Sequence, residues 1–217
     1  MMGFFARAGE YLPLLLEGVV LTLVVTFFSV ILSTALGFVW AVMSWTKQPV
    51  LVGISRGFIT MIRGIPIIVQ LFYIYFVMPD IGINLTAVQA GIIGLGIAYS
   101  AYQAENFRAG IEAIDKGQIE AAYSIGMTDS LVMRRVILPQ ALRIVMPPFG
   151  NTIIMMLKDS SLVSTITVAE LTRQGQLVAA STFDNMTVFT LVALIYLALS
   201  LPLTFLTRHL ERRFSQT

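Results

Sequence analysis

The chain contains no cysteine and only one histidine. The absence of cysteine excludes a disulfide framework, a thiolate metal site and a cysteine nucleophile. The single His209 cannot form a metal cluster, and because Arg208 and Arg212 flank it we interpret it as part of a basic anchor at a membrane surface. The sequence also lacks GxxxxGK[ST], GxSxG and HExxH stretches, so it has no phosphate-binding loop of its own and no recognisable hydrolase site.

Charged residues are scarce as well. They make up 12% of the chain, compared with about 25% in soluble domains, whereas hydrophobic residues make up 57% and the mean hydropathy is +0.83. This composition predicts an all-α integral membrane protein. The apolar segments leave no room for a soluble domain, so we expect residues 1–217 to form a single transmembrane domain.

Five apolar segments are each expected to form a membrane span. An uncharged run of 25 residues reaches across a hydrocarbon core of about 30 Å with some tilt, and the first segment has that length. Residues 1–16 mix charges and a proline with aromatic residues, which favours a segment lying at the membrane interface. The expected spans are 19–43, 57–78, 87–104, an interrupted segment beginning at 144 and resuming at 162, and 186–206.

Two of these spans carry special features. Pro66 removes a helix donor, so we expect a kink in the second span. Arg63, just before it, either reaches the headgroups at the cytoplasmic end or faces a polar seam inside the protein. In the third span Ala90, Gly94 and Ala98 recur every four residues, which predicts the close approach of another helix.

The distribution of basic residues predicts the orientation of the chain. With five spans and the C-terminus in the cytoplasm, eleven Lys and Arg residues fall on the cytoplasmic side and three fall in the membrane or outside. We therefore expect the N-terminus outside, the C-terminus inside and the polar loop within 115–142 in the cytoplasm. The eleven are Lys47, Arg56, Arg63, Arg108, Lys116, Arg134, Arg135, Arg143, Arg208, Arg212 and Arg213, and the three are Arg7, Lys158 and Arg173.

The loop within 115–142 is expected to contain two short helices. Asp115 is placed to cap the first, with Gln118 returning a bond to the cap backbone. Gly126 is expected to end that helix in a left-handed backbone conformation, which glycine adopts without strain. A second helix, capped by Thr128 or Asp129, is then expected to end at Pro139.

A spaced set of residues runs through this loop and includes Glu120, Ala121, Ala122, Gly126, Leu138 and Pro139. This set resembles the EAA loop of ABC importer permeases. The family usually has isoleucine where Val136 stands, a difference of one methylene. The resemblance implies that these residues couple the chain to an ATP-binding cassette ATPase, with the loop as a coupling helix. The alternative is an ordinary amphipathic helical hairpin at the protein surface.

Further stretches resemble the permeases for polar amino acids: 12–18, 63–66, 70–72, 101–105 and 158–162. The resemblance implies a five-span type I ABC importer permease of the bacterial inner membrane, which is not itself an enzyme. The implied partners are two ATPase subunits, a second permease subunit that is either identical or paralogous, and an external amino acid binding protein. ATP and Mg²⁺ belong to the ATPase, so no cofactor is expected in this chain.

The charged residues inside the expected spans are candidates for a substrate pathway. Tyr102 and Glu105 are three residues apart, so they share one helix face, where the carboxylate would suit the ammonium group of an amino acid. Lys158 would meet the substrate carboxylate in the broken fourth span. The candidates are Tyr99, Tyr102, Glu105, Lys158, Asp159, Ser160 and Ser161. Alternatively, Glu105 forms a structural ion pair with Arg108, and Lys158 one with Asp159 or Glu105.

Two other functions remain open at this point. An ion channel or ion-coupled secondary transporter would use Glu105 or Asp159 as a proton or sodium site, although five spans do not divide into equal inverted repeats. An intramembrane enzyme or a scaffold for electron transfer is the other possibility. The shortage of histidine and cysteine argues against metal or haem chemistry in it.

Overall fold

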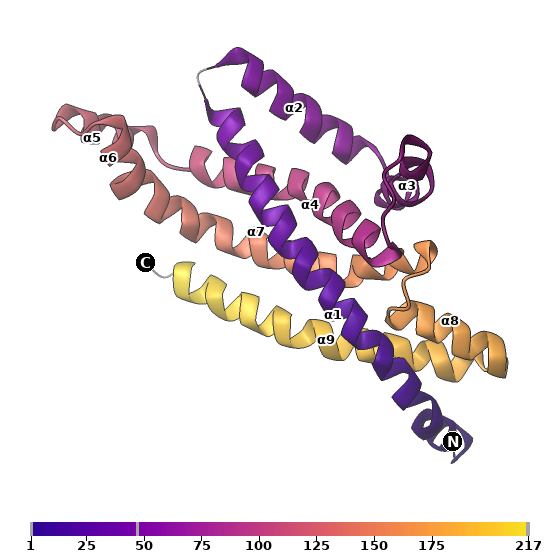
Figure 1. Ribbon diagram of the computed structural model, residues 1–217. Helices are drawn as coiled ribbons and strands as arrows, with labels where there is room; N and C mark the ends of the chain where they lie inside the picture. The colour runs from indigo at the N-terminus through magenta and orange to yellow at the C-terminus, as the bar shows by residue number, and fades with distance from the viewer. Residues whose placement is uncertain (1, 47, 216–217) are drawn as a thin grey trace.

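The computed structural model describes residues 2–46 and 48–215, with side chains described for 3–46 and 48–209. All regular structure in this part of the chain is helical, as the sequence predicted (Figure 1). The elements are α1 (Met2–Trp45), α2 (Pro49–Gly64), α3 (Ile67–Phe72), the π-helical η1 (Tyr73–Val77), the 3₁₀-helical η2 (Met78–Ile81), α4 (Ala87–Glu112), α5 (Lys116–Ser124), α6 (Asp129–Val132), the π-helical η3 (Met133–Ile137), α7 (Leu138–Asp159), the 3₁₀-helical η4 (Ser160–Ile166), α8 (Leu171–Thr182) and α9 (Asn185–Ser215).

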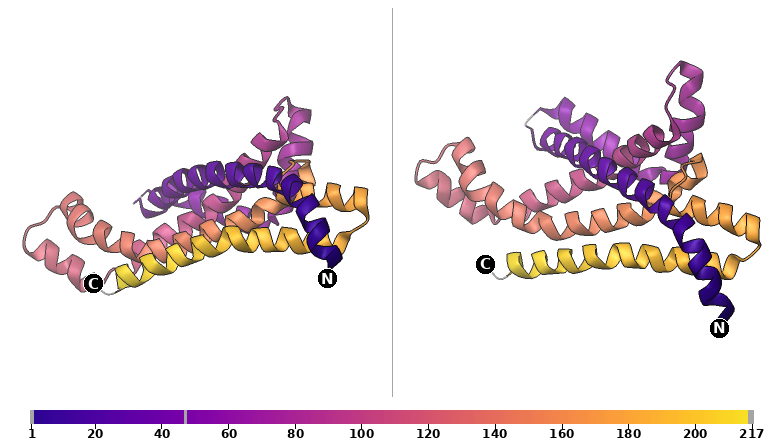
Figure 2. Two further views of the ribbon diagram at one scale, coloured as in Figure 1. Left: turned by 90° about the horizontal axis from the view of Figure 1, so that it is seen from below. Right: turned by 60° about the horizontal axis from the view of Figure 1, so that its bottom comes forward.

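Helix α1 contains the expected first span together with the segment expected to lie apart from it. Its 44 residues would extend about 66 Å, roughly twice the thickness of a hydrocarbon core. Pro13 lies inside the helix without ending it, and Figure 2 shows the first part of α1 turned relative to the rest. Tyr11 and Leu15 in this part are buried against α8 and α9. The expected separate interfacial segment is therefore the start of one continuous helix.

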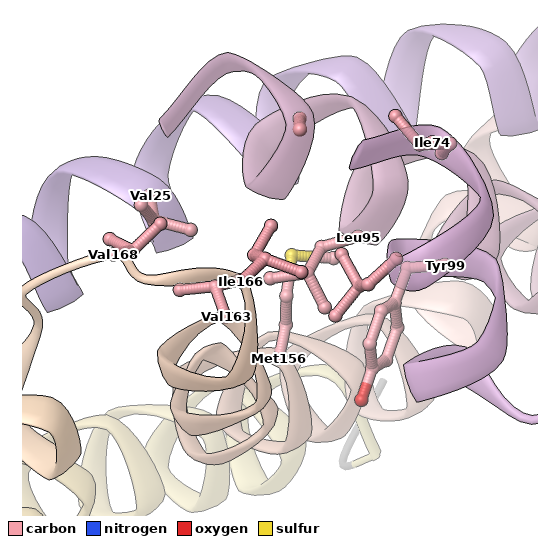
Figure 3. Close-up of a cluster of buried hydrophobic side chains, with 10 residues drawn as sticks. Val25, Ile74, Leu95, Tyr99, Met156, Val163, Ile166 and Val168 are labelled. Carbon is pink, nitrogen blue, oxygen red and sulfur yellow. The ribbon is translucent and has the colours of Figure 1, made fainter. Parts of the chain in front are cut away.

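Helix α4 lies at the centre of the packing, in contact with α1, α2, α3 and α7. Its Leu95 and Tyr99 are buried in the largest apolar cluster, which also receives Met156 from α7 (Figure 3). A Cβ atom on Gly94 would lie 2.6 Å from Leu71 Cδ2, so α3 can approach α4 here only because the side chain is absent. The predicted close approach is confirmed, and Ala90 and Ala98 on the same stripe are fully buried.

The proline kink expected in the second span is confirmed as a complete break. Helices α2 and α3 meet at an angle of 101° across Ile65 and Pro66. Gln70 is buried beside the break, where its Nε2 donates to the carbonyl oxygens of Ile62 and Ile65, each at 2.8 Å. These bonds satisfy carbonyl groups that the end of α2 leaves without an intrahelical partner.

By length and composition, two helices among the described residues qualify as membrane spans: Gly3–Trp45 and Asn185–His209. The number rises to four if each of two bent pairs counts as one span, namely α2 with the segment Ile67–Ile81, and Asp129–Ile166 with α8. Helix α4 does not qualify although it has 26 residues. Its glycine and polar residues lower its hydropathy, but other helices cover it, so few of its side chains need to face lipid.

The course of the chain places α5 and α6 at one end of the molecule and α8 at the other (Figure 1). In both views of Figure 2 the C-terminus lies toward the α5–α6 end, whereas the N-terminus lies beside α8. The segment expected to be an external polar connection from 172 to 184 is mostly α8. This helix has polar exposed residues but buries Gly175, Val178 and Ala179.

Candidate functional site

The loop expected to act as a coupling helix begins with a capped helix. The Asp115 carboxylate accepts hydrogen bonds from the backbone N–H groups of Gly117, at 2.7 Å, and Gln118, at 3.3 Å, which confirms the predicted cap of α5. The return bond expected from Gln118 is not formed. Its side-chain oxygen instead accepts from Gln140 Nε2 at 2.7 Å, which ties α5 to α7. Gly126 has φ +82°, so the predicted left-handed end is also confirmed.

The expectation that Pro139 ends the second helix of this loop is wrong. Helix α6 runs through the π-turn η3 directly into α7, and Pro139 stands at the second position of α7. In the π-turn the N–H of Leu138 bonds to the carbonyl of Met133, five residues earlier. We attribute the unbroken passage from α6 into α7 to this wider turn. Pro139 has no backbone N–H to donate, and the i to i+5 bonding just before it changes which N–H groups the helix needs there.

The loop has a small apolar core of its own. Ala122 of α5 is buried in a cluster with Ile114, Val132, Ile137 and Ala141, so α5, α6 and the start of α7 pack as a unit. Glu120, Ala121, Leu138 and Pro139 are exposed beside it. Among the residues that match the EAA pattern, Ala122 therefore packs inside the loop and Gly126 forms its turn. The remaining four are exposed and available for contact with another protein.

A groove of about 530 Å³ lies between this loop and the end of α1. Trp45 and Tyr123 line it together with Asp129, and both aromatic side chains are about half exposed. The Asp129 carboxylate accepts a hydrogen bond from the Tyr123 phenol and raises the pKa of that phenol above its ordinary value. Tyr123 is therefore a neutral donor at physiological pH.

The candidate pathway residues Tyr99 and Asp159 meet directly. Tyr99 of α4 is 1% exposed, and its hydroxyl donates to Asp159 Oδ2 at 2.6 Å, at the end of α7 (Figure 3 shows Tyr99 at the edge of the core). The Tyr102 ring lies 5.7 Å from the Tyr99 ring. A carboxylate and two phenols from two helices thus form one continuous cluster.

The structural ion pair considered for Glu105 is present. Its Oε2 lies 2.6 Å from Arg108 Nη2, and Arg108 Nη1 lies 2.6 Å from Glu112, one turn further along α4. Glu105 and Tyr102 do share one side of the helix, which faces α2. There the Arg63 guanidinium lies 5.4 Å from the centre of the Tyr102 ring. The sequence left two positions for Arg63, at the headgroups or in a polar seam inside the protein. The contact with Tyr102 agrees with the second of these.

The remaining pathway candidates, Lys158, Ser160 and Ser161, form no hydrogen bond or ion pair with the Tyr99–Asp159 cluster among the described side chains. Lys158 is exposed and forms no ion pair within the part of the chain whose side chains are described, so neither of its expected carboxylate partners is in contact. Ser160 is fully buried and donates to the carbonyl of Leu157 at 2.7 Å. Ser161 is half-buried. The structure therefore brings Tyr99, Tyr102 and Asp159 together but leaves Lys158 outside and the Ser160 hydroxyl engaged.

Sequence reasoning missed Glu170, which is fully buried. Its carboxylate caps α8 by accepting from the N–H groups of Thr172 and Arg173, at 2.9 and 2.8 Å, and also accepts from the Tyr196 hydroxyl at 2.7 Å. Thr22 of α1 donates to it at 3.5 Å. A signal was available, because Glu170 is a lone acid after an apolar run and directly precedes the polar segment that forms α8.

Comparison with known proteins adds to this geometry. Residues 33–216 match the family described as the binding-protein-dependent transport system inner membrane component. The chain belongs to this family. The transport component is also 37% identical over 206 residues to the "probable amino-acid ABC transporter permease protein YckA" of Bacillus subtilis, covering 95% of this chain and 91% of the relative.

Two further relatives agree with this assignment. The "probable glutamine ABC transporter permease protein GlnM" of Bacillus subtilis is 38% identical over 202 residues, covering 93% of this chain and 94% of the relative. A solved chain described as "crystal structure of an amino acid ABC transporter with histidines" is 39% identical, with a TM-score of 0.92 over 96% of this chain and 98% of that one. The all-helical architecture of this permease component is thus shared with a transporter of known structure.

Proposed function

We propose that this chain is the membrane-spanning permease subunit of an ABC importer for polar amino acids. A separate ATPase, which binds ATP and Mg²⁺, would drive it by docking on the loop within 115–142. An external binding protein would deliver the amino acid, and a second permease subunit, identical or paralogous, would complete the pore. The relatives described above are named for amino acid and glutamine transport, and the solved chain is described as an amino acid ABC transporter with histidines, which supports the substrate class but not one particular amino acid.

The observation that carries this proposal is the construction of the loop. Capped α5, the turn at Gly126 and the apolar cluster around Ala122 make a compact unit with Glu120 and Ala121 exposed on its surface. This unit joins α4 directly to α7. An ATPase that moves it would therefore move two long helices together, because short packed helices transmit displacement as rigid bodies.

Five membrane passes and a cytoplasmic loop are part of the proposal. The order α1, α2 with α3, α4, α7 with α8, and α9 gives five passes, with the N-terminus outside and the C-terminus in the cytoplasm. The opposite positions of the two termini in Figure 2 support an odd number of passes. The excess of basic residues on the α5–α6 side supports the orientation in a bacterial inner membrane.

The proposed substrate pathway passes the cluster formed by Tyr99, Tyr102 and Asp159. The Asp159 carboxylate, already accepting one hydrogen bond from Tyr99, has acceptor capacity left for the ammonium group of an amino acid. Closure of the ATPase pair would bring the docked loops together and rock α4 and α7, so that this cluster alternates between the two sides of the membrane.

Purification of the tagged chain in mild detergent from its native host tests the coupling role. We expect an ATP-binding subunit to co-purify with the parent and to be lost with Gly126→Pro, because proline fixes φ near −65° and Gly126 needs φ +82°. The variant should still insert in the membrane but should no longer support amino acid uptake.

Gly82 offers a matched control, because it lies in the connection between η2 and α4 and outside the loop within 115–142. It has φ +86°, and, as at Gly126, nothing lies within 4 Å of an added Cβ. Gly82→Pro introduces a comparable backbone conflict away from the loop, so the ATPase should remain bound. Equal retention of the ATPase by both variants would contradict the docking role of the loop. Absence of any ATPase from an intact parent assembly would contradict the importer assignment itself.

A further inference from the structure

A polar groove of about 340 Å³ separates α2 from α4. Arg56, Thr60 and Arg63 follow one another along α2 at spacings of four and three residues, so they lie on one side of that helix. Across the groove, Glu105 and Arg108 project from α4. Three guanidinium groups and one carboxylate therefore line a single open space.

The groove carries excess positive charge. Arg108 is matched by two carboxylates, those of Glu105 and Glu112, each at 2.6 Å. Within the part of the chain whose side chains are described, Arg56 and Arg63 form no ion pair. An arginine without a carboxylate partner on an expected membrane pass is costly unless it faces water or an anion. The groove is thus suited to a negatively charged group.

Arg63 is the better placed of the two free arginines for contact with the pathway. Its guanidinium lies 5.4 Å from the centre of the Tyr102 ring, which holds the charge by a cation–π interaction. The Tyr102 ring lies 5.7 Å from Tyr99, whose hydroxyl bonds to Asp159. The Arg63 guanidinium and the Asp159 carboxylate therefore lie at opposite ends of the Tyr102–Tyr99 pair. Of these two charged groups, Arg63 lines the groove.

We propose that Arg63 binds the carboxylate of the amino acid as it passes from the Tyr99–Asp159 cluster into the groove between α2 and α4. This replaces Lys158, which the sequence suggested for the carboxylate but which is exposed and forms no ion pair among the described side chains. A guanidinium suits the role, since its planar donors match a carboxylate with two parallel hydrogen bonds. The inference rests on the proposed amino acid import.

The test uses the complete transporter, with its ATPase, binding protein and second permease, reconstituted in lipid vesicles. Uptake of labelled L-glutamine and L-histidine is measured for the parent and for Arg63→Gln. We expect the loss of the charged bidentate donor to lower uptake by about tenfold or more. ATP hydrolysis is recorded for both transporters and uptake is expressed per ATP hydrolysed, so that a loss of assembled transporter is not counted as a loss of carboxylate binding.

A charge-restoration experiment separates carboxylate binding from a structural role. The chain has no cysteine, so Arg63→Cys introduces a single thiol into it. Treatment in detergent with 2-aminoethyl methanethiosulfonate attaches an ammonium group through a disulfide and releases methanesulfinate. The 2-sulfonatoethyl reagent attaches an anion of similar length. We expect uptake to recover at least threefold with the amine and not with the sulfonate, while the parent transporter treated in the same way should not change.

The outcomes separate the inference from the function on which it rests. If the parent imports amino acids but Arg63→Gln keeps at least half of its uptake, the carboxylate role is overturned and the importer assignment stands. Equal recovery with both reagents would also overturn it, since only size would then matter. If the parent imports no amino acid under conditions in which it hydrolyses ATP, both proposals fall together.

Discussion

Among the described side chains, Glu170 is the only formally charged residue that is fully buried. Its carboxylate accepts from two backbone N–H groups of α8, from Tyr196 of α9 and from Thr22 of α1. Thr22 Oγ1 also accepts from the N–H of Leu171 at 3.1 Å. One acidic residue thus holds three helices at a point where the chain passes from η4 into α8.

Glu170→Ala should lower the thermal stability of the permease strongly. The substitution removes the cap of α8 and takes one hydrogen-bond partner from the half-buried Tyr196 hydroxyl. Loss of a helix cap alone costs about 0.5–2 kcal/mol. Melting of the purified chain in detergent measures this. Tyr196→Phe, which removes one of these bonds, should lower the melting temperature less.

Glu10 provides the control for this prediction. It is an exposed glutamate on α1, so Glu10→Ala should leave the melting temperature unchanged within about 2 °C. A melting temperature for Glu170→Ala as high as that of Glu10→Ala would show that the buried network contributes little to stability.

At the scale of elements, the break between α2 and α3 depends on Gln70. A helix that ends inside the molecule leaves carbonyl groups without partners, and the Gln70 amide supplies two of the missing donors. This arrangement lets α3 turn by 101° and pack against α4 at Gly94. The break is therefore a specified feature and not a flexible joint.

Gln70→Glu should destabilise this corner, because a carboxylate has no donor for the carbonyl groups of Ile62 and Ile65 and its charge repels them. We expect a lower melting temperature and faster proteolysis between α2 and α3. Gln174 on α8 is a half-buried glutamine whose side chain forms no hydrogen bond within the described residues, so Gln174→Glu is the matched control. A melting temperature for Gln70→Glu equal to that of Gln174→Glu would contradict this role.

At the scale of the whole molecule, the prediction concerns orientation. Gln48, between α1 and α2, and Phe183, between α8 and α9, are both exposed and belong to connections that the proposed topology puts on opposite sides of the membrane. Since the chain lacks cysteine, single substitutions Gln48→Cys and Phe183→Cys can be labelled selectively. A membrane-impermeant maleimide should label Phe183→Cys in intact spheroplasts and Gln48→Cys only after permeabilisation. The reverse pattern would invert the proposed topology.

Much of the architecture could be predicted because lipid imposes simple rules on composition. Long uncharged runs must be helical, and a helix of glycine and alanine must be covered by other helices. The loop signals around Asp115 and Gly126 were also readable, since capping and left-handed turns depend on local residue chemistry. Pro139 misled the prediction because a π-turn can absorb a missing donor, and that adjustment leaves no simple sequence signal.

The sequence by itself determined the all-helical membrane character, the family and the capped helix and glycine turn of the loop, because each depends on composition or on residues near one another in the chain. Only the tertiary structure decided which polar groups meet. Asp159 bonds Tyr99 across 60 residues, Glu170 bonds Thr22 across 148, and Arg63 lies over Tyr102 rather than beside an acid. Such contacts depend on how helices cross and rotate, and spacing along one helix does not contain that information.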